Sequence, residues 1–386
     1  MQKLIVHGGT RLRGKVNISG SKNSSLPILA ATLLTKEECI IRRVPDLSDT
    51  NYMVQILRAL GAEVERASGV VQVKAEKIKA DTPYDLVRKM RASICVMGPL
   101  TGRLHRATVS MPGGCVIGDR PVDLHLKGLE YLGASVKMEG GNIDISAPKG
   151  LKGTTMNLLG KFGSTVLGTG NVMMAAVLAK GTTIIEGAAA EPEVEDLAHF
   201  LIAMGAKIEG AGTTHMVIEG VKELHGADHT VIPDRIEAGT FLVAGAICGD
   251  GVMLRRVNPA HVKNVTDLLE ASGYEISCAK DTVTVMPGST APKGFHLTTR
   301  TYPGFPTDMQ AQFCALACTI PELSSVRDTI FPQRFMHVPE LKRMGANIDL
   351  DGNTARITGV NSLSGAPVMA SDLRASAALV LAALNA

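Results

Sequence analysis

One cysteine stands in a setting suited to nucleophilic chemistry. Cys115 follows Gly113 and Gly114 in a glycine-rich loop, and Arg120 lies close by along the chain. Glycines let the backbone approach a ligand closely, and a neighbouring guanidinium lowers the pKa of a thiol and so increases its thiolate fraction. The segment 111–121 therefore predicts either a reactive thiol beside a ligand or a surface loop with an incidental cysteine.

Charged or polar residues recur just before long apolar segments that are typical of helices. These residues are Lys22, Arg91, Ser164, Arg235, Asp308 and Arg374. The first turn of a helix offers free N–H groups and the positive end of the helix dipole, so these positions are expected to favour anions. A single such residue is also typical of a solvated cap, and Asp308 suits a helix N-cap. Their repetition favours a site for a phosphorylated small molecule.

The elements that position these residues form a repeat. A glycine closes an amphipathic segment at Gly61, Gly133, Gly205, Gly273 and Gly345, at intervals of 72, 72, 68 and 72 residues. Each glycine is expected just after a helix, at the position where a positive φ is common. The alternating segment that follows each glycine predicts a β-hairpin.

The unit of this repeat is βαβαββ, which predicts an α/β fold. Its first helix is apolar on nearly all sides and is expected to be buried, whereas the second is amphipathic and is expected to lie against a sheet. The marker of the first helix occurs six times and the glycine marker five times, so the sixth repeat is expected to be incomplete. The length of 386 residues favours two domains of three units each, and a solenoid is the alternative.

Composition limits the classes of protein that fit this sequence. A net charge of +3 and an aromatic content of 3% argue against a nucleic-acid binder, and 45% apolar residues exclude a disordered chain. Apolar segments fall short of the ~18 residues of a membrane span, and the first residues do not resemble a signal peptide, which predicts a cytoplasmic protein. Seven cysteines without CxxC spacing fit neither a disulfide framework nor a zinc site.

Seven segments resemble those of the UDP-N-acetylglucosamine enolpyruvyl transferases (1-carboxyvinyltransferases). They are SGSKNSSLPILAA, PGGCVIGDRPVDLHLKGL, GTTIIEGAAAEPEVEDLAHFL, IPDRIEAGTFL, FPTDMQAQF, RFMHVPELKRMGA and MASDLRASAALVLA. The cysteine loop and FPTDMQAQF are the most specific of these segments. The related shikimate-pathway enolpyruvyl transferases share the fold but lack this cysteine loop.

The resemblance implies two inside-out α/β domains of the enolpyruvyl transferase type. Residues 22–232 would form the first lobe, which carries the loop 111–121, and residues 1–21 with 233–386 would form the second. The implied reaction transfers the enolpyruvyl group of phosphoenolpyruvate to the 3′-hydroxyl of UDP-N-acetylglucosamine and releases phosphate, as the first committed step of peptidoglycan synthesis. The implied partners are these two small molecules, with no cofactor, metal, nucleic acid, membrane or obligate protein partner.

The resemblance also implies residue roles. Cys115 would protonate C3 of phosphoenolpyruvate, form a covalent adduct and react with fosfomycin, and Asp308 would be the base for the sugar hydroxyl. The implied catalytic residues are Cys115, Asp308, Lys22, Asn23, Arg120 and Arg374. The implied contacts of phosphoenolpyruvate are Lys22, Asn23, Arg120, Arg334 and Arg374. The implied contacts of the nucleotide sugar are Arg91, Arg120, Pro121, Val122, Asp123, Leu124, Lys161, Ser164, Asp308 and Ile330.

Other residues are expected around this site in supporting places. Asp49 and His125 would support the residues that contact substrate. Glu191 and Glu193 would either lie near the sugar or form a solvated acidic turn.

Two features depart from the family. KFGSTVLGTGN is longer than the corresponding family segment, so Thr165, Val166 and Gly168 are alternatives to Ser164. Family members usually continue beyond ALVLAALNA with a segment that completes the sixth repeat and supplies a further arginine for phosphoenolpyruvate. A truncated, non-catalytic paralogue that binds UDP-N-acetylglucosamine is therefore an alternative function, and a repeat scaffold without a small ligand is a third.

Overall fold

The structure is a computed structural model that describes residues 3–111 and 122–386. Contacts divide the described chain into two compact units. The first, here called the 20–232 unit, contains residues 20–111 and 122–232, and the second, the 233–386 unit, also contains residues 3–19. Each unit has its own hydrophobic core. The lobes expected at 22–232 and at 1–21 with 233–386 stay predictions.

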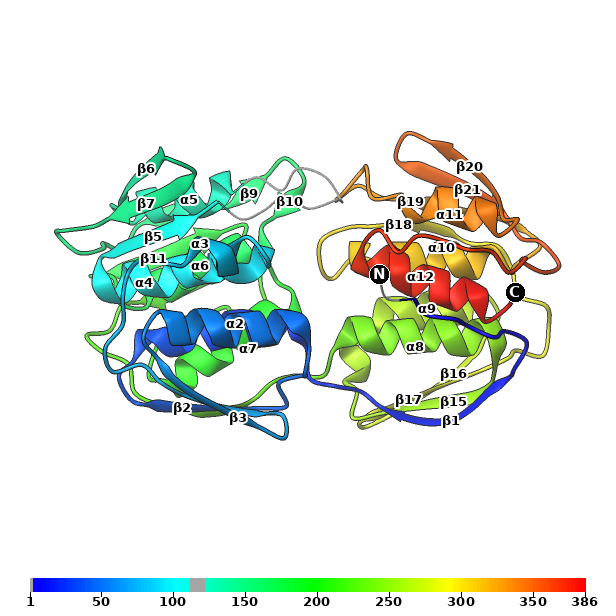
Figure 1. The fold of residues 1–386 in the computed structure, drawn as a ribbon, viewed down its shortest axis with the longest axis horizontal. Coiled ribbons are helices and arrows are strands. Elements are labelled where there is room, and N and C mark those ends of the chain that lie inside the picture. The colour runs from blue at the N-terminus through cyan, green and yellow to red at the C-terminus, as the bar shows by residue number, and fades with distance from the viewer. Residues whose placement is uncertain (1–2, 112–121) are drawn as a thin grey trace. The chain divides into compact units, whose positions relative to one another are not determined.

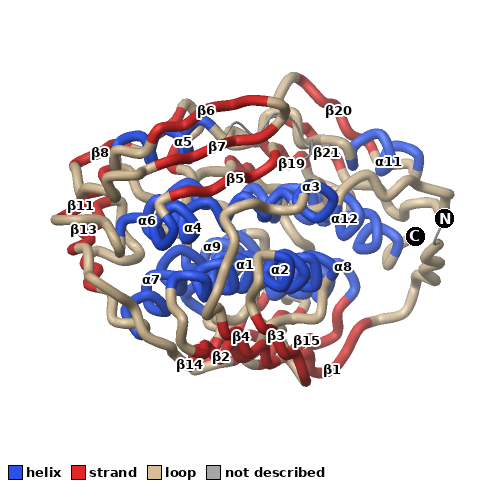
Figure 2. Tube along the Cα trace, turned by 60° about the vertical axis from the view of Figure 1, so that its left-hand side comes forward, coloured by secondary structure: helices blue, strands red, loops and turns tan. Residues whose placement is uncertain are grey.

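In the 20–232 unit, three sheets surround a group of helices (Figures 1 and 2). The first sheet has the order β14 (Asp228–Thr230), β2 (Glu38–Arg42), β4 (Val70–Lys74) and β3 (Glu63–Ala67). The second has the order β5 (Arg106–Ser110), β7 (Asn142–Ser146) and β6 (Ser135–Glu139). The third has the order β12 (Lys207–Glu209), β13 (His215–Glu219), β11 (Thr182–Glu186) and β8 (Thr155–Asn157). A small hairpin joins β9 (Leu159–Gly160) to β10 (Gly163–Ser164).

The helices of this unit alternate with its strands along the chain. They are α1 (Lys22–Ala31), η1 (Thr32–Leu34), α2 (Ser48–Ala59), α3 (Tyr84–Val87), η2 (Arg91–Val96), α4 (Met97–Leu104), α5 (Asp123–Tyr131), α6 (Val166–Ala176) and α7 (Pro192–Ala203), where η marks a 3-10 helix. Helices in the interior and sheets outside give the expected inside-out α/β arrangement (Figure 2).

The 233–386 unit repeats this plan with two sheets. One has the order β1 (Leu12–Asn17), β15 (Gly249–Arg255), β17 (Thr282–Met286) and β16 (Glu275–Ala279). The other has the order β18 (His296–Thr298), β19 (Leu323–Arg327), β21 (Thr354–Thr358) and β20 (Asn347–Asp351). The helices are α8 (Arg235–Cys248), η3 (Pro259–Val262), α9 (Lys263–Ala271), η4 (Thr307–Met309), α10 (Gln310–Ala317), α11 (His337–Arg343) and α12 (Leu373–Ala383).

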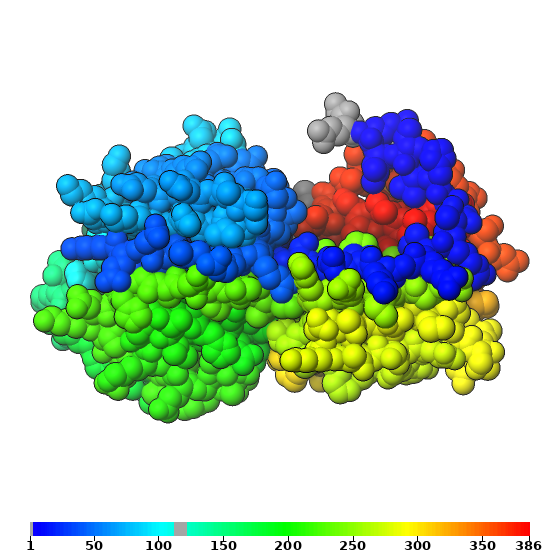
Figure 3. All heavy atoms as spheres, turned by 90° about the horizontal axis from the view of Figure 1, so that it is seen from below, coloured from blue at the N-terminus to red at the C-terminus, as the bar shows by residue number. Residues whose placement is uncertain are grey.

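Each four-stranded sheet contains one parallel pair at its edge. The strand β14 closes the first sheet by pairing parallel to β2, although almost 190 positions separate Asp228 from Ile40, its partner in the register. The N-terminal strand β1 closes the sheet of the other unit by pairing parallel to β15. Figure 3 shows the N-terminal segment, in dark blue, lying along the yellow and red parts of its own unit.

The first helices α1, α6 and α10 are largely buried, as their composition predicts, whereas α8 and α12 are only partly buried. All eight residues of α10 are buried, and in α1 the buried residues run from Ser24 to Ala31. The second helix has one buried face, since α2 buries Met53, Ile56 and Leu57 while its remaining face is exposed. Burial of apolar side chains therefore fixes the position of the helices whose first turns carry the charged residues.

The five repeated glycines occupy the predicted position after a helix. Their φ values are +105°, +91°, +100°, +95° and +87° for Gly61, Gly133, Gly205, Gly273 and Gly345. In each case the helix ends two residues earlier, and the chain turns into the next strand. A left-handed backbone is strained for residues with a side chain, which explains the recurrence of glycine.

A helix long and apolar enough to cross a bilayer does not occur in residues 3–111 or 122–386.

Replacing Gly345 by alanine isolates the cost of this left-handed backbone. A Cβ at Gly345 would lie 3.8 Å from the Ser364 Oγ, so it would strain φ without a clash. The Gly345→Ala variant should lose about 1–2 kcal/mol of unfolding free energy in urea denaturation. Gly365→Ala is the matched control, because its Cβ would meet open space and its φ lies outside the left-handed range. Equal stability of the two variants would contradict this explanation.

Candidate active site

Three of the expected site residues fall outside the described part of the chain. These are Cys115, Arg120 and Pro121. The roles of these three residues stay predictions. The remaining site residues are described in their own units.

Asp308 joins two arginines in the 233–386 unit. Its Oδ1 accepts a hydrogen bond of 2.7 Å from Arg334 Nη1, and its Oδ2 accepts one of 3.0 Å from Arg374 Nη2. The side chain of Arg334 is 6% exposed and that of Arg374 is 15% exposed. Partly desolvated charged hydrogen bonds of this kind are stronger than neutral ones. Three residues predicted from separate sequence segments thus lie in direct contact.

The two arginines set the protonation state of Asp308. Burial raises the pKa of this carboxyl group, but the charges of Arg374 and Arg334 and their hydrogen bonds outweigh burial, so the pKa lies well below its usual range. The carboxylate is therefore ionised at neutral pH. With both oxygens engaged by guanidinium groups, it is a weak base in this arrangement.

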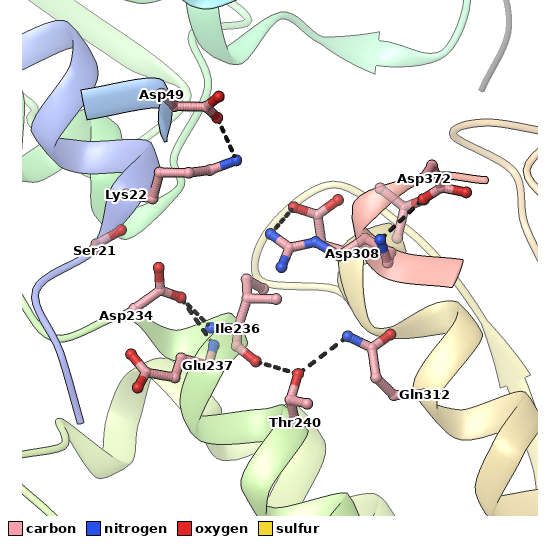
Figure 4. A network of polar contacts seen from close by, with 12 residues as sticks. Ser21, Lys22, Asp49, Asp234, Ile236, Glu237, Thr240, Asp308, Gln312 and Asp372 are labelled. Carbon is pink, nitrogen blue, oxygen red and sulfur yellow. Dashed lines mark hydrogen bonds and ion pairs between the residues drawn. The ribbon is translucent and has the colours of Figure 1, made fainter. Parts of the chain in front are cut away.

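Local capping fixes the helix that carries Arg374. The Oδ1 of Asp372 accepts hydrogen bonds from the backbone N–H groups of Arg374 and Ala375 at 2.9 and 3.1 Å, which starts α12 at a defined residue. Figure 4 shows Asp372 at this helix start and Asp308 close to it within the same unit. The alternative role of Asp308 as a helix N-cap is wrong, because Met309 caps α10 and the Asp308 carboxylate bonds to arginines instead.

A second contact fixes α10, which begins just after Asp308. Gln312 Nε2 donates a hydrogen bond of 3.1 Å to the Oγ1 of Thr240, and that hydroxyl donates one of 2.7 Å to the carbonyl of Ile236 (Figure 4). The Oδ1 of Asp234 accepts from the N–H groups of Ile236 and Glu237, both at 2.9 Å, and so caps α8. These hydrogen bonds hold α8 and α10 together beside the arginine cluster, which consists of Asp308, Arg334 and Arg374.

Lys22 makes an ion pair in the 20–232 unit. It is the first residue of α1, and Ser21 caps that helix by accepting a hydrogen bond from Ser24 N at 3.3 Å. The Nζ of Lys22 lies 3.0 Å from the Oδ2 of Asp49, which belongs to the first turn of α2 (Figure 4). Asp49 thus holds the ammonium group at the helix start, and its supporting role at the substrate stays a prediction. Asn23 lines a small hollow nearby with Val166, Leu167 and Glu193, among other residues.

The residues expected at the nucleotide sugar lie at element boundaries. In the 20–232 unit these are Arg91 at the start of η2, Val122, Asp123 and Leu124 at the start of α5, and Lys161 and Ser164 around the β9–β10 turn. Ser164 does not begin a helix, contrary to expectation, because it belongs to β10. Thr165 caps α6 instead, with its Oγ1 accepting from Gly168 N at 3.2 Å.

His125 is buried in a polar network that joins α5, α6, η2 and α4. Asn171 Nδ2 lies 2.9 Å from His125 Nδ1 and also donates to the carbonyl of Ile94, while Asn171 Oδ1 accepts from Gly98 N. Burial and the charge of Arg91 lower the pKa of His125 to about 4. The imidazole is therefore neutral at pH 7, with Nδ1 as the acceptor of the Asn171 amide.

Sequence reasoning missed two polar residues of these networks. Asn171 and Asp328 are both fully buried and hydrogen-bonded. Neither belongs to the repeated glycines or to the charged and polar residues that precede apolar segments, so the repeat pattern does not indicate them. Glu191 and Glu193 are buried at the start of α7, so a solvated acidic turn is wrong.

Within residues 3–111 and 122–386, groups of three or more His, Cys, Asp or Glu side chains placed to hold a metal ion do not occur.

Removing one arginine should raise the pKa of Asp308. In Arg374→Met, we expect the Asp308 pKa to rise, because one of two positive charges is lost. Titration of the carboxyl carbon by 13C NMR measures the shift, and Arg356→Met, at an exposed arginine of β21, is the control. Because the folded pKa of Asp308 is depressed, its stabilising effect is present above about pH 4 and is lost as pH falls below that value. An unchanged Asp308 pKa in Arg374→Met would contradict the assigned cause.

Comparisons with known proteins agree with this architecture. A family model described as EPSP synthase (3-phosphoshikimate 1-carboxyvinyltransferase) matches residues 6–386. A relative from Akkermansia muciniphila, named UDP-N-acetylglucosamine 1-carboxyvinyltransferase, is 64% identical over 388 residues, covering 100% of this chain and 91% of the relative. A relative of the same name from Methylacidiphilum infernorum is 58% identical, with 100% and 91% covered.

Solved structures show the same fold. The enolpyruvyl transferase NikO from Streptomyces tendae superposes with a TM-score of 0.86 at 26% identity, covering 98% of this chain and 90% of that one. EPSP synthase from Acinetobacter baumannii superposes with a TM-score of 0.72 at 19% identity, covering 99% and 91%. The expected fold is confirmed. Because the family model spans nearly the whole chain and the curated relatives match it from end to end, the chain belongs to the EPSP synthase (3-phosphoshikimate 1-carboxyvinyltransferase) family of enolpyruvyl transferases.

Proposed function

We propose that this chain transfers the enolpyruvyl group of phosphoenolpyruvate to the 3′-hydroxyl of UDP-N-acetylglucosamine and releases phosphate. The name shared by relatives at 64% and 58% identity supports this choice of acceptor. The observation that carries the proposal is the Asp308 carboxylate between Arg334 and Arg374, because it combines a base with two anion-binding groups. Reaction of a trianionic substrate with a hydroxyl requires both.

The reaction proceeds by addition and then elimination. The sugar oxygen bonds to C2 of phosphoenolpyruvate while Asp308 takes the hydroxyl proton and the Cys115 thiol gives a proton to C3. The resulting phosphorylated ketal loses phosphate from C2 and a proton from C3, which restores the double bond in the product. Cys115 also forms a covalent adduct with phosphoenolpyruvate. Lys22, Arg120, Arg334 and Arg374 neutralise the phosphate and carboxylate, and Asn23 supports the intermediate.

The arginine cluster links substrate binding to the strength of the base. Arg334 and Arg374 both donate to Asp308, which keeps its pKa low. The phosphate and carboxylate of phosphoenolpyruvate compete for the same guanidinium donors. When these donors turn to the substrate, the pKa of Asp308 rises and its carboxylate accepts the sugar proton more readily. The base is thus strengthened only when the second reactant is present.

The nucleotide sugar contacts the starts of several elements. Arg91 supplies a positive charge for the diphosphate, and the N-terminal turn of α5 offers Asp123 and Leu124 beside the adjoining Pro121 and Val122. Lys161 and Ser164 of the β9–β10 hairpin contact the same ligand, with Thr165, Val166 and Gly168 as alternatives to Ser164. Asp308 and the backbone of Ile330 are the remaining proposed contacts of the sugar.

This activity has a cellular setting. The reaction is the first committed step of bacterial peptidoglycan synthesis, takes place in the cytoplasm, and supports cell shape and cell division. Fosfomycin inhibits it by alkylating Cys115.

Phosphate release tests the proposed reaction and the role of Asp308. The wild-type chain should release phosphate only when both substrates are present, and mass spectrometry should detect the enolpyruvyl ether. Asp308→Asn should lower kcat by about 100- to 10,000-fold, since it removes the base. Asp349→Asn, at an exposed aspartate of β20, is the control. Heat of UDP-N-acetylglucosamine binding without any turnover would favour the non-catalytic paralogue instead.

Fosfomycin tests the choice of thiol. The wild-type chain should gain one fosfomycin mass, and Cys115→Ser should gain none, because the nucleophile that opens the epoxide is absent. Cys278→Ser is the control, since Cys278 is an exposed cysteine that should not compete. Unchanged labelling of Cys115→Ser would show that another residue reacts.

A further inference from the structure

We propose that Asp328 is a positioning residue for the arginine cluster, holding Thr307, Ile330 and Arg334 in the arrangement that the enolpyruvyl transfer requires. This inference rests on the proposed function, because it assigns Asp328 a task in that reaction. Asp328 itself contacts neither Arg334 nor Asp308 in the described hydrogen bonds, and it acts through neighbouring groups.

The Asp328 carboxylate is fully buried and accepts four hydrogen bonds. It follows β19 directly and is 0% exposed. Its Oδ1 accepts from Thr299 Oγ1 at 2.8 Å and from the N–H groups of Ile330 and Phe331 at 2.9 and 2.8 Å. These bonds compensate a charge that would otherwise be costly to bury. They also fix the backbone of the segment that leads to Arg334.

The other carboxylate oxygen reaches the segment of Asp308. The Oδ2 of Asp328 accepts a hydrogen bond of 2.7 Å from Thr307 Oγ1. Thr307 precedes Asp308 in η4, and its Oγ1 lies 3.3 Å from Arg334 Nη1, the atom that also donates to Asp308 at 2.7 Å. A continuous chain of hydrogen bonds therefore runs from Asp328 through Thr307 to Arg334 and Asp308.

The backbone of Asp328 is anchored on the opposite side. Its N–H donates to the carbonyl of Asn353 at 3.0 Å, and the Nδ2 of Asn353 donates to the carbonyl of Asp328 at 2.9 Å. Asn353 lies in the hairpin between β20 and β21, so the anchor belongs to the sheet formed by β18, β19, β21 and β20. The sheet thus determines where the carboxylate lies, and the carboxylate determines where Thr307 and the 329–334 segment lie.

A turn-stabilising role alone does not explain this arrangement. A short loop after a strand needs only the bonds from Ile330 and Phe331, which form an Asx-type turn. The bonds from Thr299 and Thr307 instead join the segments of these two residues to the segment of Asp328 through its two carboxylate oxygens. The segment of Thr307 carries the proposed base, Asp308. Displacement of such a support is expected to disturb catalysis more than stability.

The experiment compares Asp328→Asn and Thr307→Val with wild type and with Ser272→Ala. The Asn variant keeps an oxygen acceptor but loses the charge, and the Val variant keeps the size of Thr307 but loses its hydroxyl. Ser272 is a buried residue at the end of α9 whose hydroxyl donates to Leu268 O, so its Ala variant controls for loss of stability. Asp328→Ala extends the series if it folds.

We expect kcat/KM for phosphate release to fall by about 10- to 100-fold in Asp328→Asn and in Thr307→Val, the range for a lost buried hydrogen-bond partner. The double variant should be little worse than either single variant, because both interrupt one chain of bonds. The acid limb of the pH profile should move to higher pH, since a looser Arg334 leaves Asp308 facing mainly Arg374. Ser272→Ala should keep the wild-type kcat/KM and the wild-type position of the acid limb.

Rates and acid limbs equal to those of Ser272→Ala in both variants would overturn the inference. Absence of phosphate release in the wild-type chain would instead reject the proposed function. In that case hydrogen exchange still decides the structural claim, because the amides of Ile330 and Phe331 should exchange faster in Asp328→Asn than in wild type. Unchanged exchange at both amides would overturn the positioning role independently of activity.

Discussion

The site in the 233–386 unit depends on one interaction, the double ion pair of Asp308 with Arg334 and Arg374. Each arginine comes from a different part of the repeat, one from the segment after β19 and one from the first turn of α12. A carboxylate that bridges two guanidinium groups keeps all three side chains oriented and limits their desolvation cost. The same contact leaves Asp308 a weak base until a competing anion is bound, which couples the two substrates of the proposed reaction.

The fold surrounds this interaction with groups that restrict its movement. Asp372 fixes the start of α12, Gln312 ties α10 to α8 through Thr240, and Asp328 joins Thr307 to the segment of Arg334. In the other unit, Asp49 restrains Lys22, Asn171 is hydrogen-bonded to His125, and burial together with the charge of Arg91 keeps that imidazole neutral. Functional side chains at helix starts thus rely on polar groups buried behind them, in agreement with the need for preorganised sites.

Much of the architecture could be predicted from sequence, because local rules are strong at the relevant positions. The five glycines after helices, such as Gly205, are required by a left-handed backbone, and apolar composition on all sides predicted the burial of α10. Contacts that depend on the tertiary fold could not be predicted in this way. The pairing of β14 with β2 and the hydrogen bonds that Asp328 accepts from Thr299 and Thr307 join segments far apart in the sequence and have no local signature. The roles of Cys115 and Arg120 stay predictions.

The most direct measurement is the pKa of Asp308 with and without phosphoenolpyruvate. The carboxyl carbon can be titrated by 13C NMR in aspartate-labelled protein, with Asp308→Asn identifying its resonance. If the arginines turn from Asp308 to the substrate, saturating phosphoenolpyruvate will raise this pKa markedly above its value in the free protein. An Asp308 pKa that stays equally low when phosphoenolpyruvate is bound would contradict the account.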